Sequence, residues 1–333
     1  MLVEKIICAD AIDGLKQVDN GSVDMCVTSP PYFCLRDYGV PGQIGLEKTP
    51  EMYIEKLVDV FREVKRVLCD DGTLWIVIGD SYNGSNKGGN NPKYWGSHTA
   101  FEKLANPATF GKPVRLDGMK PKDLIGIPWM LAFALRADGW YLRNDIIWYK
   151  PNAMPESVTD RCSQTFEHIF LLSKSKKYYF NNEAIKEPAA DETIPRLQRG
   201  VSENHKYING PDGQSKHTMN QPRQNIKNMQ YVDEIDKKYE MVNKRNVWTV
   251  NTKSYSGSHF ATYPPDLIRP CILAGSRKGK IVLDPFFGSG TTGIVASEEH
   301  RGYIGIEINP EYVEIARKRI YETMIQYRIE DIA

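Results

Sequence analysis

The feature that most constrains the fold is a strand that runs into a glycine-rich turn, at residues 281–292. Its apolar run ends at Asp284, Gly288 and Gly290 form a Gly-x-Gly turn, and a helix-like segment begins at Thr291. In α/β sheets this order brings backbone N–H groups close to a nucleotide-like ligand, because glycine accepts positive φ and has no side chain. No lysine follows Gly290, which rejects a phosphate-cradling P-loop. A tight turn without a ligand is the alternative for these residues alone.

An acid at the end of the next strand-like run supports a nucleotide ligand. Residues 303–307 form a short apolar run that ends at Glu307. An acid at the end of the second strand, about twenty residues further on, is where a ribose diol is bound. A helix cap is the alternative role for this carboxylate.

A second motif, Ser29-Pro30-Pro31-Tyr32, follows the strand-like residues 23–28. Two successive prolines fix φ and supply no N–H, so the nearby carbonyl groups are held rigid. The Ser29 hydroxyl is an acceptor and Tyr32 offers a flat aromatic face, which together suit a planar base with an exocyclic amine. Hydrogen bonds from that amine to Ser29 Oγ and the Pro30 carbonyl would draw the nitrogen toward sp³ and free its lone pair. A proline-rich turn is the alternative.

Apolar periodicity predicts strands and helices at both ends of the chain. Residues 51–68 carry apolar side chains at a 3.6-residue spacing, which indicates a helix packed on a sheet. Strands are expected at residues 3–8, 23–28, 73–78, 140–150, 165–173, 281–284 and 303–307, and helices at 11–18, 51–68, 121–137, 265–274, 291–299 and 311–327, while a regular pattern resumes at 246–250 after the polar middle. The pattern predicts one mostly parallel α/β sheet with helices on both faces. Residues 83–118, rich in Gly, Asn and Pro, are expected to form a long surface loop.

Composition narrows the class of protein. With 333 residues, 41% hydrophobic and 26% charged, the chain can hold one large α/β domain and a smaller module. Its apolar runs are too short to span a bilayer and it starts without a basic-then-apolar leader, so we expect a cytoplasmic protein with no membrane partner. The six cysteines have no Cys-x-x-Cys spacing, which argues against disulfides, zinc or another metal.

The middle of the chain is polar. Residues 193–232 contain six Lys/Arg, two Asp/Glu and ten Asn/Gln, whereas the whole chain has a net charge of +1. Asn and Gln pair with adenine edges, Arg with guanine and Lys with phosphate, so this segment is the expected DNA-reading region. The candidates are Arg196, Arg199, Gln214, Arg223, Gln224 and Lys227. A disordered polar linker is the alternative.

Taken together, the glycine turn and the Ser-Pro-Pro-Tyr motif resemble the amino-group DNA methyltransferases that use S-adenosylmethionine. Because the catalytic motif precedes the cofactor motif, the chain resembles their permuted β group. The resemblance implies a Rossmann-like, doubly wound fold and a base that is flipped out of double-stranded DNA. It divides the chain into a catalytic half at residues 1–154, a target-recognition region at 155–254 and a cofactor-binding half at 255–333.

The resemblance also assigns residues. The implied catalytic residues are Ser29, Pro30, Pro31 and Tyr32, and the implied cofactor-binding residues are Asp10, Ala11, Thr28, His259, Phe260, Asp284, Pro285, Phe286, Gly288, Gly290, Thr291, Thr292, Glu307 and Ile308. Lys150 belongs to a segment, residues 145–152, that resembles the motif lining the target-base pocket. Arg36 is expected to clamp DNA, with a surface turn as the equal alternative.

Several alternatives remain at this stage. Ser-Pro-Pro-Tyr is typical of N4-cytosine specificity in this family, and N6-adenine is the second choice. A catalytically silent DNA-binding regulator and a nicotinamide-dependent oxidoreductase are rivals from other classes. Cys271 follows a proline as in cytosine-C5 enzymes, yet its apolar helical setting favours core packing, and His168 is expected in the core as well. A separate restriction endonuclease is a possible partner in DNA protection.

Overall fold

The computed structural model describes residues 2–35, 39–84, 116–190, 241–252 and 263–330, with the side chains of 327–330 left out. The chain divides into two compact units. One unit comprises Met1–Asn181 with Asn246–Ala333, and the other comprises Asn182–Arg245.

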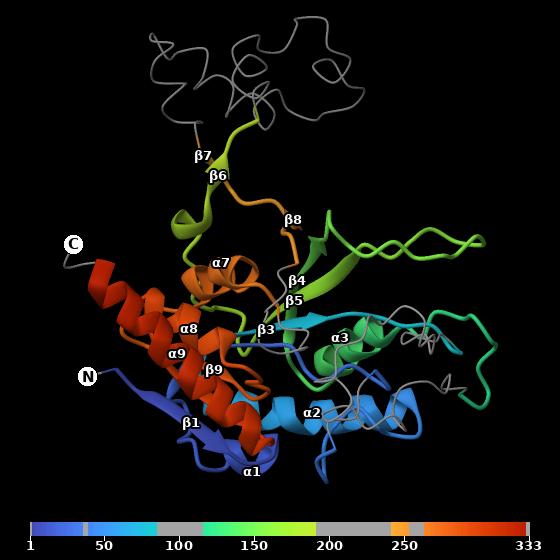
Figure 1. Ribbon diagram of the computed structural model, residues 1–333, viewed down its shortest axis with the longest axis horizontal. Coiled ribbons are helices and arrows are strands. Elements are labelled where there is room, and N and C mark those ends of the chain that lie inside the picture. The colour runs from blue at the N-terminus through green and yellow to red at the C-terminus, as the bar shows by residue number, and fades with distance from the viewer. Residues whose placement is uncertain (1, 36–38, 85–115, 191–240, 253–262, 331–333) are drawn as a thin grey trace, which may run out of the picture. The chain divides into compact units, whose positions relative to one another are not determined.

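The larger unit is built on an eight-stranded sheet with the order β1-β10-β9-β2-β3-β5-β4-β8 (Figure 1). The strands are β1 (Glu4–Cys8), β2 (Val23–Thr28), β3 (Leu68–Ile78), β4 (Tyr141–Tyr149), β5 (Phe166–Ser173), β8 (Val247–Thr249), β9 (Ile281–Asp284) and β10 (Gly302–Glu307). Within this sheet β5 runs antiparallel to β3 and β4, and every other pairing is parallel. The predicted mostly parallel α/β sheet is confirmed.

The two ends of the chain meet in the middle of this sheet. Strand β2 pairs with β9, with Met25 opposite Val282 and Cys26 opposite Leu283. All six residues of β2 are buried, as expected for a central parallel strand covered on both faces. The N-terminal and C-terminal α/β segments therefore form one sheet, which confirms the permuted arrangement.

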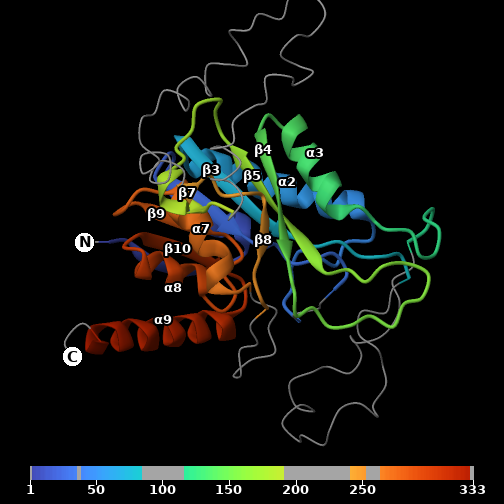
Figure 2. The same cartoon turned by 90° about the horizontal axis from the view of Figure 1, so that it is seen from above.

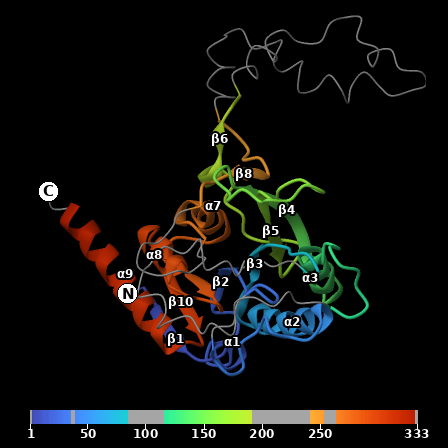
Figure 3. The same ribbon diagram turned by 45° about the vertical axis from the view of Figure 1, so that its right-hand side comes forward.

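Helices cover both faces, as Figures 2 and 3 show. One face carries α1 (Ala11–Leu15), α2 (Pro50–Val67) and α3 (Ile127–Ala137), and the other carries α7 (Pro265–Gly275), α8 (Thr291–Glu298) and α9 (Pro310–Glu330). Helix α2 begins where the Thr49 hydroxyl accepts a hydrogen bond from Met52 N at 3.3 Å. Its periodic apolar residues, including Tyr53, Leu57, Phe61 and Val64, are fully buried.

The largest differences from the predicted boundaries are at the starts of β3 and α3, and α1 also ends three residues earlier than predicted, at Leu15. Strand β3 begins at Leu68, directly after α2, because an irregularity in the β2–β3 register accommodates the residues before Thr73. Helix α3 begins at Ile127 rather than near residue 121. The Asp80 carboxylate accepts from the backbone N–H of both Gly126 and Ile127, at 3.0 and 3.1 Å, and so caps the helix there.

The second unit, Asn182–Arg245, is described only at its two ends. A 3₁₀ turn, η2 (Glu183–Ile185), precedes β6 (Glu187–Pro188), which pairs antiparallel with β7 (Met241–Val242). The region predicted for target recognition, 155–254, thus includes β5 and β8 of the central sheet as well as this unit. Its recognition role stays a prediction, and most of its polar middle lies outside the described residues.

In the described ranges no helix combines the length and the apolar character needed to cross a membrane. The same ranges contain no group of three or more His, Cys, Asp or Glu that could hold a metal ion. The six cysteines all lie in described residues and are thiols rather than disulfides, and Cys271 is fully buried within α7, which supports its expected packing role.

Candidate active site

A cavity of about 970 Å³ opens at the carboxyl edge of the parallel strands. The residues that follow β1, β2, β9 and β10 line it, since parallel strands end on the same edge of a sheet. Strand β5 runs the opposite way, so its first residues reach this edge as well. The cavity therefore collects side chains from both ends of the chain, and its size is that of a cofactor pocket.

One wall of the cavity is the Ser-Pro-Pro-Tyr segment. The Tyr53 hydroxyl, from α2, donates to the Pro31 carbonyl at 2.8 Å and fixes the loop from behind. The Tyr32 hydroxyl donates to Glu167 Oε2 at 2.6 Å. Burial, together with the charge of Glu167, raises the pKa of Tyr32 well above its ordinary value. The phenol therefore stays protonated and acts as a donor.

The opposite wall is made by the glycine turn and Glu307. Glu307 Oε2 accepts from Gly288 N and Oε1 accepts from Asn309 N, both at 2.8 Å. A carboxylate oxygen has a second lone pair, so each can still accept from a hydroxyl group. Burial raises the pKa of Glu307, and the two backbone N–H groups oppose that shift. This geometry suits a diol such as ribose.

A buried hydroxyl group in the lining of the cavity has no partner among the described residues. Among the described side chains Thr291 Oγ1, at the first turn of α8, is buried without a hydrogen bond, and Thr291 lines the cavity. An unpaired buried polar atom in a cavity is the mark of a position that a polar ligand completes. Asp10 lines the cavity from the start of α1, where its carboxylate caps the helix by accepting from Ile12 N and Asp13 N. These residues fit a nucleotide-like cofactor.

The Asp284 carboxylate holds the glycine turn in place through hydrogen bonds. Its buried carboxylate accepts from the hydroxyls of Thr28 and Thr292 at 2.6 Å and of Tyr263 at 2.9 Å, and from Phe286 N at 3.0 Å. Thr28 lies 256 positions away in the sequence, so this carboxylate ties the end of β2 to the end of β9. Burial raises the pKa of Asp284, and these donors oppose the shift.

Both glycines of the turn have positive φ, 51° at Gly288 and 83° at Gly290. They differ in surroundings. A Cβ at Gly288 would meet nothing within 4 Å, whereas one at Gly290 would lie 2.9 Å from the Cβ of Ala316 in α9. Gly290 is therefore required by helix packing, and Gly288 is the position that leaves space in the cavity.

The structure brings most of the predicted residues together. Those that line the cavity are Asp10, Ala11, Ser29, Pro30, Pro31, Tyr32, Lys150, Pro285, Phe286, Gly288, Thr291, Glu307 and Ile308. Those that support it from beneath are Thr28, Asp284, Gly290 and Thr292. Those that lie outside the described residues are Arg36, His259, Phe260, Arg196, Arg199, Gln214, Arg223, Gln224 and Lys227.

The cavity is also lined by residues that sequence reasoning did not assign to the site, among them Glu167. Glu167 is an acid near the start of β5, a strand whose later residues, from His168 to Ser173, are all buried. Such an acid signals an edge of the sheet that faces a polar site. His168 is in the core as expected, with Nδ1 2.9 Å from Asp145 Oδ1.

The sheet is Rossmann-like, and one cavity at its edge has a wall suited to an amine and a turn suited to a nucleotide. This combination is typical of an α/β enzyme that transfers a group from a nucleotide cofactor to an amine. Comparison with known proteins identifies the family. The family model for N6/N4 methyltransferases, described as DNA methylase, matches residues 23–318. The chain is 48% identical to the type II methyltransferase M.SmaI of Serratia marcescens, over 95% of this chain and 90% of that protein. It is 46% identical to M.Cfr9I of Citrobacter freundii, over 93% and 85%.

The fold agrees with solved structures. The PvuII DNA methyltransferase (cytosine-N4-specific) matches with a TM-score of 0.58 at 16% identity, covering 97% of this chain and 92% of that one. A DNA modification methylase from Thermus thermophilus, complexed with S-adenosyl-L-methionine, matches with a TM-score of 0.54 at 22% identity, covering 96% of each chain. The chain belongs to the N6/N4 DNA methylase family.

Proposed function

We propose that this chain transfers a methyl group from S-adenosylmethionine to the exocyclic N4 amine of a cytosine flipped out of double-stranded DNA. The observation that carries the proposal is that the Ser29–Tyr32 wall and the Gly288–Glu307 wall line the same cavity. An exocyclic amine cannot reach a methyl donor while its base is stacked in the duplex, so the base must enter this cavity. The type II relatives support a role in restriction–modification.

Different residues of the cavity serve cofactor binding and target-base binding in this proposal. Glu307 would accept from the ribose hydroxyls of the cofactor, Asp10 would bind its adenine part, and Thr291 would supply its unpaired hydroxyl. When bound, S-adenosylmethionine supplies an electrophilic methyl group on a sulfonium. Ser29 Oγ and the Pro30 carbonyl accept from the target amine, and the Tyr32 ring stacks on the base. Direct attack by the amine needs no strong general base, so positioning carries most of the catalysis.

Cytosine is proposed because Ser-Pro-Pro-Tyr, with a hydroxyl in place of a carboxylate or amide, is typical of N4 specificity in this family. The test is nucleoside mass spectrometry of duplex DNA after incubation with the protein and S-adenosylmethionine. We expect N4-methyldeoxycytidine. N6-methyldeoxyadenosine would overturn the choice of base, and cofactor binding without any methylated nucleoside would favour a silent regulator.

The variant Ser29→Ala is a second test of the proposal. It should leave cofactor affinity intact while methyl transfer falls on the order of tenfold to a thousandfold, as for one lost transition-state hydrogen bond. Near-normal turnover in this variant would show that the amine is held elsewhere.

A further inference from the structure

The loop between β4 and β5, residues 150–165, projects beyond the ends of these strands (Figure 1). It carries Met154, whose side chain is 87% exposed and also lines the cavity. Of the large apolar side chains in the described residues, it is the only one that is both exposed and part of the cavity lining. Single exposed apolar residues are ordinary on a protein surface, so its place at the opening of the reaction site is what distinguishes this methionine.

The loop that carries Met154 is joined to the wall proposed to hold the target base. Lys150, the first residue of the loop, pairs with Glu167, and Glu167 accepts from the Tyr32 hydroxyl at 2.6 Å. These three residues line the cavity together with Met154. The methionine therefore lies on a loop that contacts the part of the cavity suited to an amine.

The backbone on both sides of Met154 is held in place. Before it, the Asn152 side chain donates to the Thr252 carbonyl and accepts from Thr252 N, both at 2.9 Å. After it, Glu156 Oε2 accepts from Arg161 Nη1 at 2.6 Å, across the same loop. A side chain on a braced loop has less backbone freedom to lose when it binds, so its exposed position is already prepared for a ligand.

A base that leaves the duplex stays attached through its sugar and phosphate, so the opening of its pocket faces the place that it vacates. Proteins that separate neighbouring base pairs often insert an apolar side chain such as Phe, Leu or Met between them. Methionine is long, unbranched and flexible, and it therefore fills irregular gaps well. An apolar side chain that is held in water at this opening gains burial when it enters the stack.

We propose that Met154 inserts into the base stack of duplex DNA at the place vacated by the flipped target base. The proposal rests on the function proposed above and adds the residue that keeps the base out of the stack. Burial of the methionine between the neighbouring base pairs offsets part of the stacking that is lost when the base leaves. Insertion thus favours the state in which the base occupies the cavity, and it plays no part in cofactor binding.

The test is single-turnover methyl transfer by the wild type and Met154→Ala on two duplexes with the same methylation site, located beforehand by sequencing methylated DNA. In one duplex the target base is paired, and in the other it faces an abasic position. On the paired duplex the variant should be about tenfold slower, because flipping is costly there. On the unpaired duplex, where flipping costs less, the loss should be less than about twofold. Met154→Leu keeps an apolar side chain of similar size and should match the wild type on both duplexes.

The controls separate insertion from folding and cofactor binding. Met154→Ala should unfold in urea at the wild-type midpoint, because an exposed side chain contributes little to stability, and calorimetry should give an unchanged affinity for S-adenosylmethionine. Tyr321→Ala removes another exposed side chain, 68% exposed on α9 and outside the cavity lining, and should leave both rates unchanged. An equal loss for Met154→Ala on both duplexes, no loss on either, or a leucine variant as slow as the alanine variant would overturn the proposal. Failure of the proposed function is a separate outcome, since the wild type would then transfer no methyl group to cytosine in either duplex.

Discussion

Thr291 and Thr292 are adjacent threonines with opposite environments. Thr292 Oγ1 donates to buried Asp284 at 2.6 Å, whereas Thr291 Oγ1 is buried at the cavity without a partner. A buried hydroxyl without a partner contributes nothing to folding and is costly to keep. This contrast predicts that Thr292 serves the fold and that Thr291 serves a ligand.

Thr291→Val should therefore leave the free energy of unfolding unchanged or raise it, while S-adenosylmethionine affinity falls about fivefold, the equivalent of about 1 kcal/mol. Thr292→Val should instead destabilise the protein by about 1–2 kcal/mol, because it leaves the buried Asp284 short of a donor. Urea unfolding and titration calorimetry measure the two effects. A loss of stability in Thr291→Val that matches that of Thr292→Val would contradict the distinction.

The glycines of the turn make a second matched pair. Gly290→Ala should lose about 2 kcal/mol or more of stability, since the new methyl meets Ala316 and the backbone has positive φ. Gly288→Ala should lose about 1 kcal/mol of stability from positive φ alone. Relative to that loss, it should weaken cofactor binding more than Gly290→Ala does. Denaturant titration with and without S-adenosylmethionine compares the two. The same ratio of binding loss to stability loss in both variants would argue against a ligand beside Gly288.

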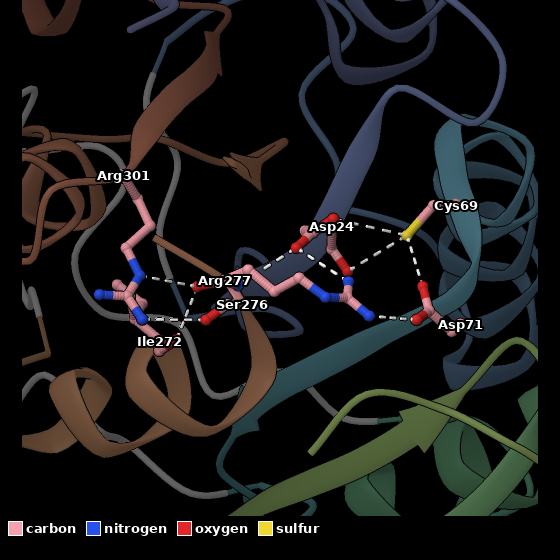
Figure 4. Close-up of polar contacts among 7 residues, drawn as sticks. All are labelled: Asp24, Cys69, Asp71, Ile272, Ser276, Arg277 and Arg301. Carbon is pink, nitrogen blue, oxygen red and sulfur yellow. Dashed lines mark hydrogen bonds and ion pairs between the residues drawn. The ribbon is translucent and has the colours of Figure 1, made fainter. Parts of the chain in front are cut away.

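At the scale of elements, a polar cluster ties strands together at the edge of the sheet opposite the cavity. Arg277, just after α7, pairs with Asp24 at the start of β2 and with Asp71 in β3 (Figure 4). The Cys69 thiol contacts Asp71 at 3.2 Å, and burial raises its pKa to about 12. Beside this cluster, the Arg301 guanidinium donates a hydrogen bond to the Ser276 carbonyl at 2.9 Å. The cluster joins parts of the chain far apart in sequence, as the Asp284 cluster does at the other edge.

This cluster makes stability depend on pH in acid. The hydrogen bond from Arg277 holds the pKa of Asp71 below its ordinary value of 3.8. A carboxyl group with a lowered folded-state pKa contributes stability above 3.8, and that contribution is lost as the pH falls through and below this value. Arg277→Met should cost about 2 kcal/mol at pH 7, mostly by leaving buried Asp24 short of a partner.

The measurement is urea unfolding of both proteins from pH 7 to pH 3. The difference between wild type and Arg277→Met should shrink at the acid end, as the Asp71 carboxyl group takes up a proton. A difference that stays constant would show that Arg277 acts through packing on the Tyr179 ring, whose centroid lies 4.1 Å from Cζ, and not through charge.

At the scale of the whole molecule, the smaller unit can be tested by removal. Pro188 pairs directly with Met241, so the two ends of the segment between them are already adjacent. Replacing residues 189–240 by a short glycine-containing turn should leave the larger unit folded, because a hairpin can close at this point. Cofactor affinity should remain and site-specific methylation should disappear. Loss of cofactor binding in this deletion would show that the segment supports the fold rather than recognition.

Within that segment, Arg223 and Gln224 remain the predicted base-reading residues. Alanine at either should relax methylation toward duplexes that differ at one base pair, with roughly 1–3 kcal/mol less discrimination. A panel of single-base-variant duplexes at fixed salt measures this. Equal loss on every duplex would mean that the segment only holds DNA.

Local sequence by itself determined the class of fold, most strand and helix positions, and both walls of the cavity. Strand periodicity, the Gly-x-Gly turn and the two prolines act through the backbone of adjacent residues, so their effect is visible without tertiary contacts. That is why Ser29, Gly288 and Glu307 could be assigned before any coordinates, and why the start of β3 and of α3, which depend on a register shift and on a distant cap by Asp80, could not.

Only the tertiary structure decided which side chains become hydrogen-bond or packing partners. The antiparallel direction of β5 brings Glu167 to the cavity, and no local pattern encodes the direction of a strand within a sheet. The pairing of β2 with β9 places the Thr28 hydroxyl on the Asp284 carboxylate, a contact between residues 256 positions apart. The packing of α9 against the glycine turn places Gly290 beside Ala316. Spacing along the chain identifies residue types, whereas the partners of a buried polar group are set by packing across the sheet.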